Sequence, residues 1–267
     1  MKPLLITGAN GRVGQLLRSP LGNSVIWSRR GPGADLDWDP LAGPEPLIDH
    51  CTQHGAPAAL LQLARGLAGD PLRDDAAIGR ATLAATQAAG IPRVLFASTS
   101  AVYGLSRPEP WEESDPVAPQ SPYARSKLAM EQACAAPGVT MLRIGNVAGA
   151  DALLTNPARP LLLDHFADGT GPVRTYIGPQ TLARVLLALA QAPALPSVLN
   201  IATPKPLDMA DLAAAAGLPV KRQPAPPGAL ARLTLATARL ETLYAFGDTD
   251  SDPATMVAEW RACKDPE

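Results

Sequence analysis

The sequence predicts an α/β fold in which helices cover both faces of a doubly wound parallel sheet. Two observations carry this prediction. Short, wholly apolar segments alternate along the 267 residues with longer segments of helical period, which is the pattern of a parallel sheet built from β-α-β units. A glycine-rich turn at 7–14 joins the first apolar segment to the first helical one, as in sheets of this kind.

Each element follows from its local pattern, because buried strands are short and apolar whereas helices repeat every 3.6 residues. The helix expected at 74–89 ends at Gly90-Ile91-Pro92, a combination that stops helices. Strands are predicted at 3–7, 24–28, 58–64, 94–98, 140–144 and 198–201. Helices are predicted at 12–18, 74–89, 123–135 and 182–190.

The glycine-rich turn follows the first strand and opens the first helix, the context that dinucleotide binding requires. Gly8 permits the tight turn, Gly11 lets the backbone approach a pyrophosphate, and Gly14 allows close helix–strand packing. The helix N-terminus offers unpaired N–H groups to the phosphates. The loop residues predicted to bind the cofactor are Gly8, Asn10, Gly11, Arg12, Val13 and Gly14.

The end of the second strand predicts which dinucleotide is preferred. An acid at this place would select NAD through the adenosine ribose. Here the strand runs into Arg29 and Arg30, and the first acid is Asp35. Because the planar arginine fork binds phosphate well, the sequence predicts NADP in preference to NAD.

The bulk composition excludes several classes of partner. A net charge of −2 provides no basic field for nucleic acid or an anionic membrane. The chain opens directly into a strand, so neither a signal peptide nor a membrane span is expected. Three separated cysteines, Cys51, Cys134 and Cys263, suit reduced thiols in a cytoplasm. Cys51 and His54 lack a second pair of ligands, so no metal site is predicted.

The pattern changes after about residue 147, where prolines become frequent and the elements shorter. We therefore expect a Rossmann-type dinucleotide-binding domain at 1–148, with returns to the main sheet near 176–202. Residues 149–175 and 203–267 are expected to form a small substrate-binding lobe, most of it C-terminal.

Tyr123 and Lys127 form the candidate acid/base pair. The phenol of tyrosine has an ordinary pKa near 10, and a lysine four residues later lies on the same helix face. Its positive charge can stabilise the phenolate, so that Tyr123 exchanges a proton with an alcohol or carbonyl oxygen. Ser98-Thr99-Ser100 forms a hydroxyl-rich turn at the end of the strand at 94–98, and a hydroxyl there can hydrogen-bond the reacting oxygen.

Four motifs together resemble the extended short-chain dehydrogenase/reductase family, also described as the NAD-dependent epimerase/dehydratase family. They are Thr7-Gly-x-x-Gly-x-x-Gly14, Ser98-Thr-x-x-Val-Tyr-Gly104, Pro119-Gln-Ser-Pro-Tyr-x-x-x-Lys127 and Arg143-x-x-Asn146-Val-x-Gly149. The resemblance runs over most of the chain. It implies a cytoplasmic enzyme that binds NAD or NADP, acts on a sugar-like substrate and forms a homodimer.

The resemblance also implies individual roles. Thr99, Tyr123 and Lys127 become the catalytic set, with Thr99 preferred over Ser100 as the catalytic hydroxyl. Asn146 corresponds to a substrate contact, and Arg174 to a residue that binds a substrate phosphate. The remaining residues implied to bind the cofactor are Asp35, Leu36, Leu63, Ala64 and Ser98, with Tyr123 and Lys127. The residues implied to bind substrate are Thr99, Ser100, Asn146 and Arg174.

The chain departs from the family pattern in ways that concern the substrate. Ser100-Ala101 stands where the family's 4,6-dehydratases have Asp-Glu, so dehydration is not expected. Arg65 replaces a small residue beside the cofactor, and Ile78 stands in the apparent place of an asparagine. The segment from Asn146 to Arg174 is short for a nucleotide-sugar pocket.

Two functional hypotheses remain open at the level of sequence. One is an NAD(P)-dependent epimerase or reductase acting on a sugar-like, possibly nucleotide-sugar, hydroxyl or carbonyl. The other is a non-catalytic NADP-binding redox sensor or regulatory protein, which would be expected to have lost Tyr123 or Lys127. The expected homodimer would pair the helices at 74–89 and 123–135 through Ala84, Ala85, Ala88 and Ala129.

Overall fold

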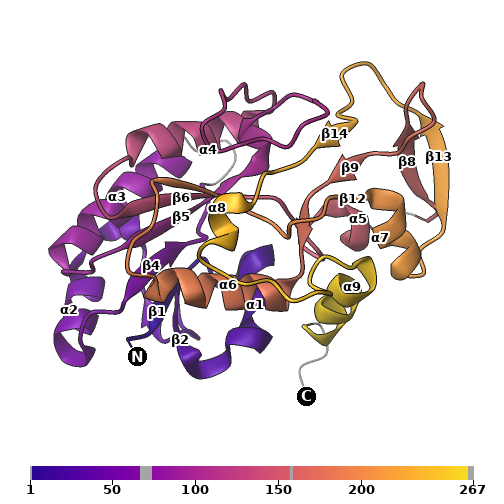
Figure 1. The fold of residues 1–267 in the computed structure, drawn as a ribbon. Coiled ribbons are helices and arrows are strands. Elements are labelled where there is room, and N and C mark those ends of the chain that lie inside the picture. Colours follow the sequence, from indigo (N-terminus) through magenta and orange to yellow (C-terminus); the bar gives the residue numbers. More distant parts are fainter. Residues whose placement is uncertain (1, 67–73, 157–158, 264–267) are drawn as a thin grey trace.

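The computed structural model describes residues 2–66, 74–156 and 159–263 (Figure 1). Its described residues form a seven-stranded sheet in the order β11-β6-β5-β4-β1-β2-β3, and each pairing is parallel. The strands are β1 (Leu4–Thr7), β2 (Val25–Arg29), β3 (Leu36–Asp37), β4 (Ala59–Gln62), β5 (Val94–Thr99), β6 (Val139–Ile144) and β11 (Val198–Ile201). The predicted doubly wound α/β fold is confirmed.

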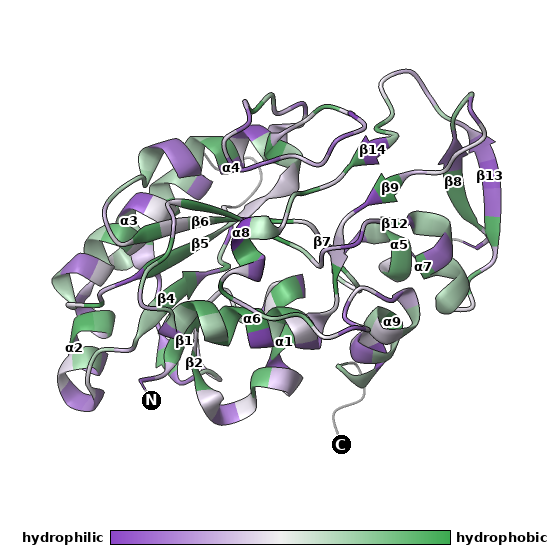
Figure 2. Ribbon diagram, viewed as in Figure 1, coloured by the Kyte–Doolittle hydropathy of each residue, from purple (hydrophilic) through white to green (hydrophobic). Residues whose placement is uncertain are grey.

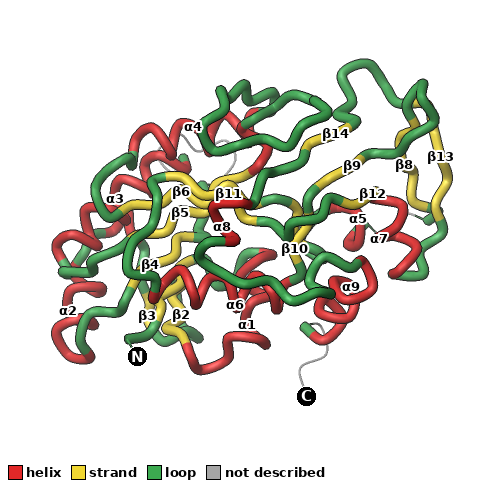
Figure 3. The backbone as a smooth tube through the Cα atoms, viewed as in Figure 1, coloured by secondary structure: helices red, strands yellow, loops and turns green. Residues whose placement is uncertain are grey.

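Helices cover both faces of this sheet (Figure 3). On one face lie α1 (Arg12–Leu21) and α6 (Pro179–Gln191), and on the other α2 (Glu45–His54), α3 (Asp75–Ala88) and α4 (Pro122–Ala133). Two hydrophobic cores result, because successive side chains of a strand point to opposite faces. Leu4 and Ile6 belong to the core beneath α1 and α6, whereas Leu5 belongs to the other. In Figure 2 the central strands β5 and β6 are accordingly coloured mostly as hydrophobic.

The predicted elements of the main sheet agree with the structure to within a few residues. The differences lie at weakly patterned segments. β3 has two residues, and α2 buries only Leu47 and Cys51, so neither carries a clear periodic signal. The starts of α3 and α4 are set by side-chain caps, since Asp74 accepts from the Ala77 N–H and Ser121 from the Ala124 N–H.

A smaller lobe lies beyond the carboxyl edge of the sheet, to the right in Figure 1. It contains short strand pairs and short helices, and we keep the boundaries expected from the sequence as a proposal. Its strands are β8 (Leu161–His165), β9 (Val173–Arg174), β12 (Leu207–Asp208), β13 (Val220–Pro224) and β14 (Arg232–Leu233), whereas β7 (Asn146–Val147) and β10 (Tyr176–Ile177) pair with each other and join the main core. Its helices are α5 (Ala152–Thr155), α7 (Met209–Ala215) and α9 (Pro253–Ala262), whereas α8 (Ala238–Glu241) packs against β11 of the main sheet.

The strand order reverses direction between β1 and β4, since β2 and β3 continue on one side and β5, β6 and β11 on the other. In open α/β sheets such a switch point opens a crevice at the carboxyl ends of the strands, where ligands bind. None of the helices in the described ranges is long and apolar enough to cross a membrane.

Candidate active site

The glycine-rich turn has the geometry that its sequence implied. Gly8 has a φ of 77°, and a Cβ on it would lie 2.4 Å from the Ala64 backbone nitrogen. A Cβ on Gly14 would lie 2.6 Å from the Gly8 carbonyl oxygen. Gly11 is the N-cap residue of α1 and has no side chain that could hydrogen-bond the helix N–H groups. The N–H groups of the first helical turn therefore face the crevice with no protein side chain capping them.

Two adjoining cavities flank this turn, and both are lined by Gly11 and Arg65. The first, of about 360 Å³, holds Thr99, Tyr123 and Lys127, and we call it the reaction cavity. The second, of about 390 Å³, holds Arg29 and Arg30, and we call it the arginine cavity. The cavities thus run along the loop and helix N-terminus in the manner of a dinucleotide site.

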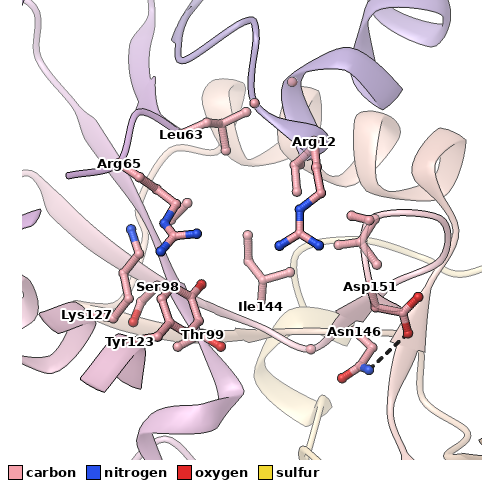
Figure 4. A pocket seen from close by; sticks show the side chains of 17 residues that line it. Arg12, Leu63, Arg65, Ser98, Thr99, Tyr123, Lys127, Ile144, Asn146 and Asp151 are labelled. Atoms are coloured by element: carbon pink, nitrogen blue, oxygen red, sulfur yellow. Dashed lines mark hydrogen bonds between the residues drawn. The ribbon is translucent and has the colours of Figure 1, made fainter. Parts of the chain in front are cut away.

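Tyr123 projects from the first turn of α4 into the reaction cavity (Figure 4). Burial raises the pKa of its phenol, whereas the positive charge of Arg65 and a hydrogen bond with Thr99 act to lower it. The Arg65 guanidinium carbon lies 4.5 Å from the centre of the Tyr123 ring, within cation–π range. The structure therefore brings the predicted hydroxyl and phenol together and adds a cation beside them.

Lys127 lies one helical turn further along α4 and is almost wholly buried. Its Nζ is 3.4 Å from Oδ1 of Asp75 on α3. Burial lowers the pKa of Lys127, and the charge of Asp75 opposes that change. Asp75 also accepts hydrogen bonds from the Gly66 N–H and the Ser126 hydroxyl, each at 3.0 Å. The ammonium thus reaches the cavity as half of an ion pair.

Sequence reasoning missed Asp75. On α3 the resemblance pointed only to Ile78, which stands in the apparent place of the family's asparagine. Ile78 lines the arginine cavity. The residue of α3 that contacts Lys127 is Asp75, the first residue after the Asp74 cap. Its position one turn before Ile78 on an amphipathic helix was the available signal, because residues three or four apart share a face.

Asn146 and Asp151 form the wall of the reaction cavity that faces Tyr123 (Figure 4). Oδ2 of Asp151 accepts from the Asn146 amide at 3.3 Å and from the Tyr176 hydroxyl at 2.6 Å. Oδ1 of Asp151 is buried and has no hydrogen-bond partner. Burial raises the pKa of this carboxyl. Asn146 therefore lies where it was predicted, and Asp151 is a polar lining residue that sequence reasoning did not identify.

The arginine cavity contains three buried polar atoms without a hydrogen-bond partner. They are Oγ1 of Thr7, Oγ of Ser28 and Nε of Arg29. A terminal nitrogen of Arg29 donates to Oδ1 of Asn10 at 3.3 Å. Buried polar groups are normally satisfied, and Thr7, Ser28 and Arg29 all belong to the wall of this cavity, which is therefore polar.

An acid also lines the arginine cavity. Asp39 lies there with its carboxylate 4.0 Å from a terminal nitrogen of Arg30. Trp38 and Pro40 flank it on the cavity wall. Arg30 lies next to Asp39, and Arg29 and Arg65 are two further cations on the wall of this cavity.

Some residues that the resemblance placed in the site lie elsewhere. The Asp35 carboxylate accepts from the Trp27 backbone N–H at 2.8 Å, and Asp35 lies in a separate surface hollow. Leu36 is buried in the core. Trp38 and Asp39 line the arginine cavity in their place, because β3 carries the chain two residues further before it reaches the crevice.

Two predicted substrate contacts also do not line the reaction cavity. The guanidinium of Arg174 donates to three backbone carbonyls, those of Val173, Leu230 and Ala231. Ser100 is buried at the start of the turn after β5. The other predicted positions, Leu63, Ala64 and Ser98, do line the two cavities, although the Ser98 hydroxyl donates to Glu131 at 2.5 Å.

Comparison with known proteins gives a consistent result. The chain is 38% identical over 118 residues to UDP-glucose 4-epimerase of Rhizobium meliloti (strain 1021), covering 39% of this chain and 36% of that protein. It spans about a third of the length of the curated relatives that it matches.

Two solved structures share the fold over nearly their whole length. One is UDP-glucose 4-epimerase (galE) from Stenotrophomonas maltophila with bound NAD and formylated UDP-arabinopyranose, with a TM-score of 0.77, 19% identity and 99% coverage of both chains. The other is TunA, an NAD dependent-NDP-hexosamine 5,6-dehydratase, with a TM-score of 0.73, 23% identity and coverage of 100% of this chain and 99% of that one. At these identities the likeness concerns the fold alone.

The family model described as NAD dependent epimerase/dehydratase matches residues 4–173. This segment contains the glycine-rich turn, the Thr99 strand end and the helix of Tyr123 and Lys127. The chain therefore belongs to the NAD dependent epimerase/dehydratase family.

Proposed function

We propose that the protein is an NAD(P)-dependent oxidoreductase that acts at a hydroxyl or carbonyl carbon of a sugar-like substrate, as an epimerase or a reductase. One observation carries this proposal. Thr99, Tyr123 and Lys127 line a single cavity whose floor is the uncapped N-terminus of α1. A proton-transfer group and a dinucleotide-binding turn therefore share one space.

The residues present fit a dinucleotide. Gly8 and Gly14 let the loop pack closely against Ala64 and against itself, and the N–H groups at the start of α1, which have no side-chain cap, can bind a pyrophosphate. The unpaired oxygens of Thr7 and Ser28 offer partners to a ribose in the arginine cavity. When bound, the nicotinamide of this cofactor accepts or returns a hydride.

We propose NADP in preference to NAD. Arg29 lines the arginine cavity, and Arg30 lies next to Asp39, the only acid on that wall among the described residues. A guanidinium with free donors suits the 2′-phosphate of NADP. An adenosine ribose without that phosphate would leave the Arg29 charge unmatched.

The chain's own residues supply the proton chemistry. The Tyr123 hydroxyl can give a proton to a carbonyl oxygen or take one from an alcohol, and Thr99 can hydrogen-bond the same oxygen. Asn146 and the unpaired Oδ1 of Asp151 can bind further hydroxyls of the substrate from the facing wall. These polar groups suit a polyhydroxylated molecule.

The relatives named UDP-glucose 4-epimerase support an epimerase on a nucleotide sugar, whereas the arginine cavity supports a reductase that consumes NADPH. Ser100-Ala101 follows the catalytic threonine, with no acid or base to assist elimination of water. We therefore do not expect 4,6-dehydration. The homodimer remains part of the proposal.

The test combines cofactor binding with turnover. Titration of the wild-type chain with NADPH and NADH, followed by nicotinamide fluorescence, should show binding with NADPH tighter. A panel of nucleotide sugars and simple sugar lactones, followed by absorbance of the reduced nicotinamide, separates a reductase from an epimerase, which returns its cofactor unchanged.

Replacement of Tyr123 by Phe should lower turnover by about 10²–10⁴-fold, because the proton donor is lost, while NADPH binding persists. Preserved turnover in this variant would contradict the assignment. A redox sensor is the alternative function, and its partner-dependent output would survive the same substitution.

A further inference from the structure

The charges around Tyr123 do not come from one lysine. Lys127 and Asp75 carry opposite charges 3.4 Å apart, and both side chains are 4% exposed. At a distance of one helical turn such a pair acts as a dipole, whose field falls off faster than that of a single charge. The pair alone therefore gives Tyr123 much less positive potential than an unpaired lysine would.

Arg65 supplies a second cation at the same place. Its guanidinium stacks over the Tyr123 ring at 4.5 Å and points into the reaction cavity (Figure 4). Within the described ranges this guanidinium makes no ion pair and donates no hydrogen bond to the protein. Together Arg65, Lys127 and Asp75 carry a net charge of +1, and without Arg65 they carry none.

The other charged groups near Tyr123 do not replace Arg65. Arg12 reaches the cavity from α1, and its effect in lowering the pKa of Tyr123 ranks behind those of Arg65 and Thr99. Glu131, on α4 beyond Lys127, is paired with Arg143 at 2.8 Å. Asp75 acts in the opposite sense and raises the pKa of Tyr123.

From this arrangement we infer that Arg65 acts through Tyr123 in the proposed reaction, as the cation that stabilises its phenolate, and that Asp75 makes Arg65 necessary by neutralising Lys127. The turnover part of this inference rests on the proposed function. The ionisation of Tyr123 does not, because it is measurable in the protein without substrate.

The experiment is a double-mutant cycle with Arg65→Gln, Asp75→Asn and the combination of both. The pH at which Tyr123 ionises is followed by the near-ultraviolet absorbance of phenolate, and the Tyr123→Phe spectrum is subtracted to remove the other tyrosines. Far-ultraviolet circular dichroism at each pH confirms that the chain stays folded. An Arg80→Gln variant, which removes an equal charge from an exposed position of α3, is the matched control.

Loss of Arg65 should raise the pH of Tyr123 ionisation by about 1, because an opposite charge at this distance favours the charged form by that order. Loss of the Asp75 charge should lower it, since Lys127 is then unpaired. The double variant should return close to wild type, and Arg80→Gln should change nothing.

Turnover at neutral pH should change in parallel with the ionisation of Tyr123. It should fall about tenfold or more in Arg65→Gln, and addition of Asp75→Asn should restore it. A merely structural role for Arg65 predicts no such rescue. The inference is overturned if Arg65→Gln leaves the ionisation of Tyr123 unchanged, or if the double variant resembles Arg65→Gln. Failure to bind either dinucleotide would instead remove the proposed function and leave the titration result standing.

Discussion

At the scale of single residues, the spacing of residues in the chain determines which side chains share a helix face, and the surrounding residues determine the charge that they experience. The four-residue spacing of Tyr123 and Lys127 predicts a shared helix face, and both line the reaction cavity. The charge that Tyr123 experiences depends on Asp75 and Arg65, which reach it from α3 and from the segment after β4. The proposed acid/base pair lies on one helix, but the charged groups next to it come from other parts of the chain.

The proposed preference for NADP also depends on single residues. Replacement of Arg29 and Arg30 by alanine should weaken NADPH binding by about 10-fold to 100-fold, since a charge-assisted phosphate contact contributes about 1.5–3 kcal/mol. NADH binding should change little, because it lacks the 2′-phosphate. Fluorescence titrations with both dinucleotides measure the effect. Equal losses for NADH and NADPH would show that the arginines do not read the phosphate.

At the scale of elements, the start of α4 positions the chemistry. The Ser121 hydroxyl accepts a hydrogen bond from the Ala124 N–H at 3.1 Å, and Pro122 opens the helix. Pro at the first position and Ser at the cap are both favoured at helix starts. Tyr123 is the next residue, so the cap fixes the direction from which the phenol enters the cavity.

Replacement of Ser121 by alanine should therefore lower the free energy of unfolding by about 1 kcal/mol. Turnover should fall as well, because the first turn of α4 frays and Tyr123 loses its fixed position. Chemical denaturation measures the first effect and steady-state kinetics the second. Ser19→Ala on the exposed surface of α1 is the control. An unfolding free energy unchanged from wild type would show that the cap contributes nothing.

At the scale of the whole molecule, the faces of α3 and α4 are the proposed dimer surface. Ala84, Ala88 and Ala129 are exposed in the single chain, whereas Ala85 is buried in its core. Small exposed side chains permit close approach of a second copy, and a two-fold axis would pair the same helices from each chain.

Light scattering of the purified protein should therefore give twice the 27.7 kDa mass of the chain. Ala84→Glu should give the mass of a single chain, because a buried, unpaired carboxylate opposes association. Ala214→Glu on the exposed face of α7 is the matched control. A wild-type protein with the mass of one chain would contradict the proposed dimer.

Local patterns in the sequence were sufficient for much of this fold and for part of the site. Continuous apolar runs identify strands buried on both faces, such as Leu4–Thr7, because only such strands need apolar residues at every position. The glycines of the first turn identify a dinucleotide site, since their conformations and close contacts exclude other side chains. The apolar run and the spacing of the glycines are local patterns, so the sequence by itself determines them.

Only the tertiary structure decided which charges meet in the site. Arg174 was expected to bind a substrate phosphate, yet its guanidinium donates to backbone carbonyls of the small lobe. Asp35 lies outside the cavity, whereas Asp75 is paired with Lys127 and Arg65 stacks on Tyr123. The physical reason is that electrostatic interactions act through space between segments far apart in the chain, and no local pattern records which segments fold together.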